Sequence, residues 1–268
     1  MAYFKRGNVE LYYELHGEKT KPVVVLLNGI MMSTLSWHGH LPDLTRFFQV
    51  LLMDFRDQGK SSRMSQNYDI SIHAEDLNAL LDHLNIDKIN VVGLSYGGQV
   101  AQLFALMNPQ RVNALVLSNT PARISPYLQE LGEAWKEAAR LYDGEKFFSL
   151  AIPFIYSDTF YNNNLKWLKK RQEAFKTLLD KDWFNGFIRL ASSNLSFNTL
   201  DELSGIKSPT LLVMADRDII TPINEMELIK EKIPNSECLI IHDAGHAAFL
   251  EKQGEFLAAV MGFLLRYN

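Results

Sequence analysis

A serine stands between two glycines in the segment Gly93-Leu94-Ser95-Tyr96-Gly97. Such a Gly-x-Ser-x-Gly motif arises by chance in a chain of this length about one time in ten, so its surroundings decide its meaning. Here it follows a strand-like run, KINVV, and opens a helix-like run. A sharp strand-to-helix turn exposes a serine hydroxyl, and glycines two residues away avoid collision with neighbouring backbone. Ser95 is therefore a candidate nucleophile.

A serine hydroxyl needs a base within hydrogen-bond reach, and an imidazole base needs an acid that fixes its tautomer. His246, in AGHAAFLE, follows the last apolar run of the chain, and Asp218, in LLVMADRDIITP, follows the run before it. Asp216 is a rival acid two residues earlier. We predict that Ser95 is the nucleophile, His246 the general base and Asp218 the orienting acid.

Attack of a serine on a carbonyl also places negative charge on the carbonyl oxygen, which needs hydrogen-bond donors. One donor is expected to be the backbone N–H of Tyr96, directly after the nucleophile. The loop after the first buried run, LLNGIMMSTLSW, should supply the other, and position favours the N–H of Ile30.

The remaining six histidines have weaker cases for chemistry. His38 and His40 resemble a metal-binding pair, but no third ligand has a plausible spacing. We expect surface or packing roles for all six, and neither a metal nor an organic cofactor. They are His16, His38, His40, His73, His83 and His242.

The elements that must position these residues are readable from the apolar pattern. Val9, Leu11 and Tyr13 alternate with polar neighbours, as in one strand of an antiparallel hairpin. Continuous apolar runs, typical of parallel strands buried on both faces, cover 22–29, 48–56, 88–95, 114–120, 209–218 and 236–246. Helical spacing separates them at 70–86 and 97–109, and a last helix is expected at 256–267. This alternation predicts an α/β fold with a mostly parallel central sheet flanked by helices.

One segment breaks the alternation. Residues 123–199 carry helical patterns without a clear buried strand, and they hold 15 of the 30 aromatic residues. We predict a helical cap there, inserted in a core of residues 1–122 and 200–268. Most of the aromatics should pack the cap's own core, and a minority should line a pocket at the carboxyl ends of the strands.

Composition narrows the class of partner. The net charge is −4 and the sequence has no basic stripe, which argues against nucleic acid as a partner. The chain has a single cysteine, Cys238, so no intrachain disulfide can form, and we expect this residue in the core. Neither a signal peptide nor an apolar stretch long enough to span a bilayer is apparent. We expect a cytoplasmic monomer or homodimer that acts on a small molecule and does not insert in membranes.

Together these pieces resemble the α/β-hydrolase superfamily over nearly the full length of the chain. The matching motifs are, in order, LLNG, DFRDQGKSS, GLSYGG, ADRDIITP and GHAAFLE. The chain departs from the family pattern at Asn28, where His is usual before glycine, and at Asp57, where glycine is usual. The stretch GLSYGGQVAQLFALMNPQRVNALVLSNTPARI is similar to that of enol-lactonases acting on β-ketoadipate enol-lactone. An acidic substrate would require a cationic side chain in the site. Arg123 is a candidate for this role, and the alternative is that Arg123 forms a salt bridge on the surface.

The resemblance implies hydrolysis of a carboxylic ester, thioester or lactone of a small, largely apolar substrate through an acyl-enzyme on Ser95. Two alternatives stay open. Related folds with the same triad hydrolyse C–C bonds or transfer acyl groups, and some relatives bind ligands with little turnover. Dehalogenase and epoxide-hydrolase chemistry is disfavoured, because those relatives carry Asp at the position of Ser95.

Overall fold

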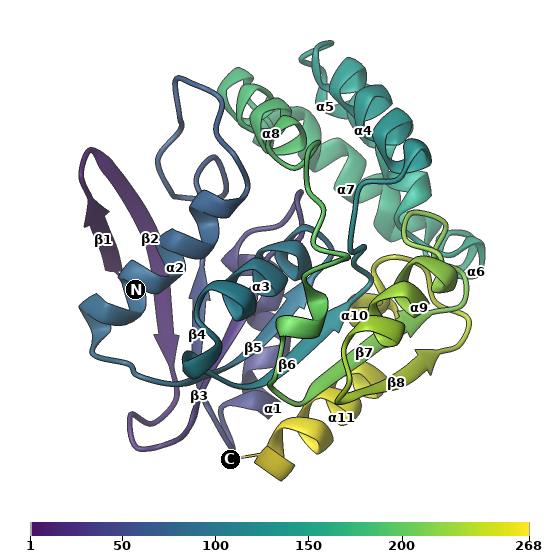
Figure 1. The fold of residues 1–268 in the computed structure, drawn as a ribbon. Helices are drawn as coiled ribbons and strands as arrows, with labels where there is room; N and C mark the ends of the chain where they lie inside the picture. Colours follow the sequence, from purple (N-terminus) through teal and green to yellow (C-terminus); the bar gives the residue numbers. More distant parts are fainter. Residues whose placement is uncertain (1, 268) are drawn as a thin grey trace.

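Eight strands form one sheet in the computed structural model, which describes residues 2–267 (Figure 1). Their order across the sheet is β1-β2-β4-β3-β5-β6-β7-β8. The β1–β2 and β2–β4 pairs are antiparallel, and every other pair is parallel. The strands are β1 (Ala2–Arg6), β2 (Val9–His16), β3 (Val23–Leu27), β4 (Gln49–Met53), β5 (Ile89–Leu94), β6 (Val112–Ser118), β7 (Thr210–Ala215) and β8 (Ser236–Ile241). The predicted hairpin and mostly parallel sheet are therefore confirmed.

Alternation along each strand builds a hydrophobic core on both faces of the sheet. In β3, Val25 and Leu27 belong to one buried cluster, and Val24 and Leu26 belong to the other. Side chains of a strand point alternately to the two faces, so a continuous apolar run fits a strand that is covered on both.

Strand β8 differs from the prediction of a strand buried on both faces. It lies at the edge of the sheet, and Leu239 and Ile240 are exposed. Cys238, expected in the core, is only partly buried, although it packs against one of the two clusters. An apolar run does not reveal whether its strand will have a neighbour on both sides.

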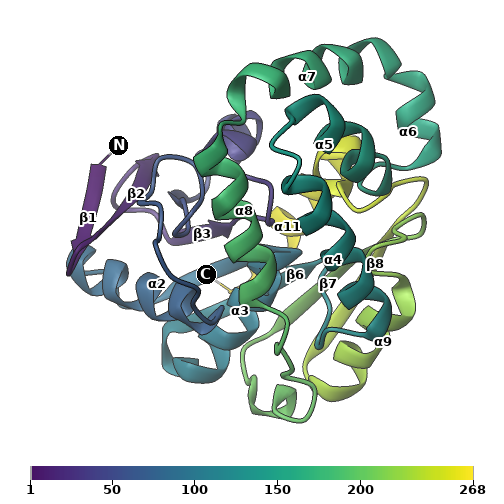
Figure 2. The same ribbon diagram turned by 90° about the horizontal axis from the view of Figure 1, so that it is seen from above.

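Helices cover the two faces of the sheet (Figures 1 and 2). The first cluster receives side chains from α2 (Ser71–Leu84), α3 (Tyr96–Met107) and α9 (Ile223–Lys232), and the second from α1 (Leu41–Leu44), α10 (Ala248–Glu251) and α11 (Gln253–Leu264). Short 3₁₀ turns are η1 (Thr34–His40), η2 (Pro109–Arg111), η3 (Ile152–Phe154), η4 (Leu203–Gly205) and η5 (Leu265–Tyr267). Within residues 2–267, none of the helices combines the length and apolar character that a membrane span requires.

Five helices lie between β6 and β7, on the side of the carboxyl ends of the parallel strands (Figures 1 and 2). They are α4 (Pro126–Ala139), α5 (Gly144–Ala151), α6 (Asp158–Asn163), α7 (Leu165–Leu178) and α8 (Lys181–Ser193). Trp135, Phe147, Phe184 and Phe187 form a buried cluster of their own between these helices. A single antiparallel bridge joins Arg123 to Asn198 near the predicted ends of the cap, and the division into core and cap at these residues stays a prediction.

Candidate active site

Ser95 occupies a strained turn between β5 and α3. Its backbone has φ 54° and ψ −117°, in a region that side-chain-bearing residues rarely adopt. The turn is held because the Ser95 N–H donates to the carbonyl oxygen of Ser118 over 2.9 Å. A Cβ atom on Gly97 would lie 2.3 Å from the carbonyl oxygen of Leu27, and one on Gly93 would lie 2.5 Å from that of Gly97. Both flanking glycines are thus required by contact with backbone, as the motif predicts.

The structure brings Ser95, His246 and Asp218 together in one hydrogen-bonded relay. His246 follows β8, and its Nε2 lies 2.8 Å from Ser95 Oγ. Its Nδ1 lies 2.8 Å from Oδ2 of Asp218, which follows β7. All three side chains stand at the carboxyl ends of strands, where residues far apart in the sequence meet.

Backbone amides and one side chain fix the Asp218 carboxylate. Its Oδ1 accepts the N–H groups of Ile220 and Thr221 over 2.8 and 2.9 Å. Its Oδ2 also accepts Nδ2–H of Asn119 over 2.8 Å. Sequence reasoning missed Asn119, although its place directly after strand β6, at the same sheet edge, was a usable signal.

The rival acid Asp216 faces elsewhere. Its Oδ2 lies 2.9 Å from Nδ1 of His242, and its Oδ1 accepts the N–H of Asp243. Of the two candidate acids, only Asp218 lies within hydrogen-bond distance of His246.

The residues of the two predicted backbone donors line the pocket next to Ser95. Tyr96 is the first residue of α3, so its N–H belongs to the first turn of a helix, where amides have no intrahelical acceptor. Ile30 lies in the loop after β3, and both residues line the cavity that contains Ser95. The two predicted oxyanion donors therefore come from segments that meet at the nucleophile.

A buried amide network holds the loop that contains Ile30. Asn28 Oδ1 accepts Nε1–H of Trp37 over 2.9 Å, and Asn28 Nδ2 donates to the carbonyl of Met53 and to Gln58 Oε1. Gln58 Nε2 donates to the carbonyl of Gly29 over 2.9 Å. Asn28, which replaces the usual histidine, thus acts through Gln58 on the backbone of the loop.

Asp57, which replaces the usual glycine, stands at φ 64°, the left-handed region that favours glycine. Its buried carboxylate receives two hydrogen bonds from the Arg189 guanidinium, at 3.0 and 2.6 Å, and others from the Tyr68 hydroxyl and the Met64 N–H. The bonds to Asp57 raise the pKa of Arg189 against the opposing effect of burial. Since Arg189 belongs to α8, the side chain at this turn ties the core to the helices above it.

Two cavities have Ser95 in their lining. The first, here called the α4 lobe, has a volume of about 80 Å³, and the second, the Arg171 lobe, about 150 Å³. Trp135 borders both, so a minority of the aromatics between β6 and β7 do line the site. The α4 lobe is lined by residues such as Ile124, Leu128, Leu131 and Ile220, and the Arg171 lobe by residues such as Met31, Ile152, Ile155, Phe249 and Leu250.

One cation faces the second lobe. The half-buried Arg171 guanidinium lies 4.8 Å from the centroid of the Trp167 ring and 5.8 Å from that of Phe175. It forms no ion pair with the carboxylates of residues 2–267. Arg123, the cation singled out from the sequence, is exposed and lines neither lobe.

His38 and His40 do not come together as a pair of metal ligands. Both lie in η1, and two residues along a helix with three residues per turn point in different directions. His40 is buried, and its Nε2–H donates to the carbonyl of Phe249. His38 instead lies close to Glu14 and His16. The spacing along the chain did not suggest that these three side chains would meet.

Comparison with known proteins places the chain in one family. A family model described as the α/β hydrolase fold matches residues 22–253. The protein named "Putative carbamate hydrolase RutD" of Azorhizobium caulinodans is 27% identical, over 98% of each chain. Among solved structures, MGS-M2, an α/β hydrolase from a Medee basin deep-sea metagenome library, is 35% identical with a TM-score of 0.95, covering 98% of this chain and 97% of its own. The enol-lactonase of Burkholderia xenovorans LB400 is 25% identical with a TM-score of 0.89, covering 98% of this chain and 100% of its own. With its sheet order and the relay at the strand ends, this chain belongs to the α/β-hydrolase family and is a hydrolase.

Proposed function

We propose that the protein hydrolyses a carboxylic ester or lactone through an acyl-enzyme on Ser95. The observation that carries this proposal is the unbroken relay from Ser95 Oγ through His246 to Asp218 beside a pocket. His246 removes the hydroxyl proton as Ser95 attacks the carbonyl carbon, and then gives this proton to the departing alkoxide. Water, activated by the same imidazole, next releases the acyl group. Asp218 stays ionised and stabilises the imidazolium.

In this proposal the N–H groups of Ile30 and Tyr96 hold the oxyanion of the tetrahedral intermediate. Loss of one such donor commonly lowers kcat by about 10²–10³. The helical segment 123–199 serves as the cap that closes over the two lobes. A cytoplasmic location and a monomeric or homodimeric state remain predictions from the sequence.

The lining of the pocket supports a small substrate with an apolar body. Both lobes are lined mostly by apolar side chains, and Arg171 offers a charge at one side of the second lobe. We therefore extend the proposal to substrates whose far end carries a carboxylate. Relatives named as an enol-lactonase and a carbamate hydrolase support testing lactones and carbamates beside esters.

Labelling with a fluorophosphonate probe tests the nucleophile. Rapid modification at Ser95 is expected, with the phosphorus bound to Oγ and fluoride released, and Ser95→Ala, His246→Ala and Asp218→Asn should abolish or strongly slow it. Asp216→Asn is the matched control and should label like the wild type. Absence of labelling in a folded protein would refute the acyl-enzyme and favour the alternative of a ligand-binding protein.

A pair of matched esters tests the substrate class. Arg171→Gln should raise KM about 10-fold for a p-nitrophenyl hemisuccinate, since a hydrogen bond to a charged group contributes about 1.5–3 kcal/mol before solvent screening. KM for p-nitrophenyl butyrate should stay unchanged, and Arg123→Gln should change neither value. Equal effects of both variants on both esters would contradict a carboxylate site at Arg171.

Product analysis with an added alcohol separates hydrolysis from acyl transfer, and a vinylogous diketone as substrate tests for C–C cleavage.

A further inference from the structure

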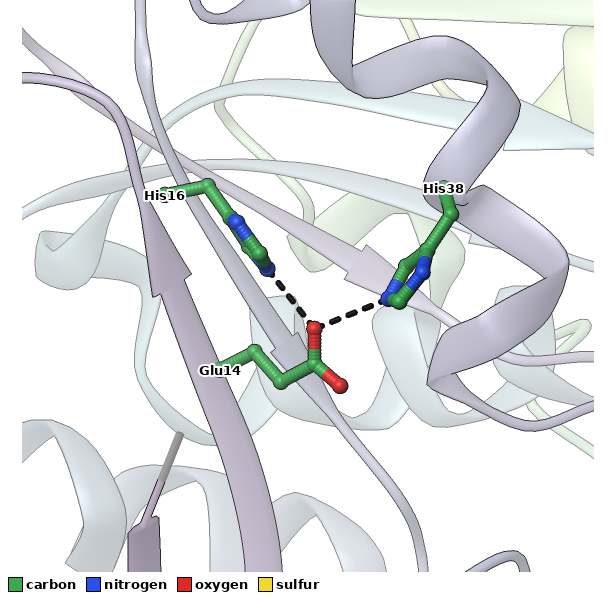
Figure 3. Close-up of side chains that lie close together, drawn as sticks. All are labelled: Glu14, His16 and His38. Carbon is green, nitrogen blue, oxygen red and sulfur yellow. Dashed lines mark hydrogen bonds and ion pairs between the residues drawn. The ribbon is translucent and has the colours of Figure 1, made fainter.

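Three side chains that can bind a metal converge away from the catalytic relay (Figure 3). Glu14 and His16 come from β2, and His38 comes from η1. Glu14 Oε2 lies 2.7 Å from Nε2 of His16 and 2.9 Å from Nε2 of His38. In residues 2–267 this is the one group of three or more His, Cys, Asp or Glu side chains that could surround a metal ion.

The local backbone explains why the three meet. Glu14 and His16 are two residues apart in a strand, so their side chains leave the same face. Thr34, at the start of η1, donates its hydroxyl to Glu14 Oε1 over 3.2 Å, which brings η1 against that face of β2. His38, one turn further along η1, then points back at the carboxylate (Figure 3).

The carboxylate is oriented before any ion arrives. Its Oε1 accepts the hydroxyls of Tyr12, over 2.9 Å, and Thr34, so only Oε2 is directed between the imidazoles. Outer hydrogen bonds of this kind commonly orient metal ligands. Glu14 Oε2 is therefore the carboxylate oxygen that faces both imidazoles.

We propose that Glu14, His16 and His38 form a binding site for a divalent transition-metal ion of the zinc class. The ligands would be Oε2 of Glu14 and the Nε2 atoms of the two histidines. Two imidazoles and a carboxylate are a donor set that Zn²⁺ accepts in tetrahedral geometry. The imidazole side chains are 26% and 36% exposed, so water can reach the site and take the fourth position.

Coordination would change the distances between the ligand atoms. Tetrahedral ligands about 2.0–2.1 Å from zinc lie about 3.3 Å apart. The two N···O distances would have to lengthen by about half an ångström. The Nε2 atoms of the two histidines lie within 4.8 Å of each other, and coordination would set their separation near 3.3 Å as well. Each coordinating Nε2 must be free of its proton. A neutral imidazole carries its single proton at Nδ1 instead, and an imidazolium loses the Nε2 proton to solvent, so both bound imidazoles are neutral.

An ion at this site would clamp η1 to the sheet. The residue before His38 is Trp37, whose Nε1–H holds Asn28 beneath the loop that contains Ile30. A ligand that binds the folded chain alone raises its stability in proportion to the logarithm of its concentration over Kd. The role that we propose for the ion is therefore structural: it would hold η1 in place and take no part in the bonds that form and break at Ser95.

Calorimetric titration of the chelator-treated full chain with ZnCl₂ tests the proposal. One ion should bind per chain, and Zn²⁺ at about 100 times Kd should raise Tm by about 5 °C. His16→Gln and His38→Gln should each weaken binding by at least about 100-fold and remove the Tm shift. Two matched controls should bind as the wild type does: His83→Gln at an exposed histidine elsewhere, and His246→Gln, which excludes binding at the catalytic relay.

X-ray absorption of the zinc-loaded protein gives a second readout that does not depend on the stability of the variants. Two imidazole nitrogens and two oxygens around the ion are expected in the wild-type protein. No binding at 1 mM Zn²⁺ would overturn the proposal. Binding that is undiminished in His16→Gln and His38→Gln would overturn it as well.

Discussion

Replacing Asp57 by glycine restores the residue usual in the family at a left-handed turn, yet we expect this change to destabilise the protein. Glycine would relieve strain in the backbone, because φ 64° costs about 1 kcal/mol for a residue with a side chain. The loss of the side-chain contacts lowers the free energy of unfolding by more than this. The Asp57 carboxylate is fully buried, and its partner Arg189 is only 15% exposed.

Removal of one partner from a buried ion pair costs about 3–5 kcal/mol, because the other charge stays without compensation. Subtraction of the backbone gain leaves a loss of about 2–4 kcal/mol in the free energy of unfolding. For a chain of this size that corresponds to a fall in Tm of about 5–10 °C. Since Arg189 belongs to α8, which borders the α4 lobe, KM should also rise.

Equilibrium unfolding in urea of a double-mutant cycle measures the effect. Asp57→Gly and Arg189→Met should each be destabilising, whereas the double variant should lie close to the wild type, because no unpaired charge remains and the turn is relaxed. A single Asp57→Gly variant as stable as the wild type, or two losses that simply add, would refute the reasoning.

Three further predictions address the loop, the acid stability and the turn at Ser95. Asn28→Ala leaves Trp37 Nε1–H without its acceptor and removes the donor to Gln58 Oε1, so steady-state kinetics should show kcat reduced about 10–100-fold with KM little changed. A rise in KM alone would contradict this. Burial lowers the pKa of His73 to about 3, below the ordinary value near 6.5, so its contribution to stability is present above pH 6.5 and is lost as the pH falls toward 3. Urea unfolding should show about 2 kcal/mol lost between pH 6.5 and 4.5, and His73→Phe should lack that part of the slope. Gly97→Ala should unfold or lose fluorophosphonate labelling, because its Cβ would collide with backbone, whereas Gly262→Ala, with no atom within 4 Å, should be neutral or stabilised by about 0.5–1 kcal/mol.

The sequence alone determined the features that local pattern encodes. Continuous apolar runs predicted the parallel strands, because a strand covered on both faces needs apolar side chains at every position. The glycines around Ser95 predicted the turn, since the backbone there tolerates no Cβ. Polar residues just after strands predicted His246 and Asp218, because parallel strands bring their carboxyl ends to one edge.

Only the tertiary structure decided which distant side chains meet. In the sequence, Asp57 stands out only because glycine is usual at its position, whereas in the structure its carboxylate is paired with Arg189, 132 residues away. The sequence also suggested His38 with His40 as a pair, whereas the structure joins His38 to Glu14 and His16. Periodicity reports which side of an element faces the core. The partner on that side depends on how separate elements pack, which spacing along the chain does not encode.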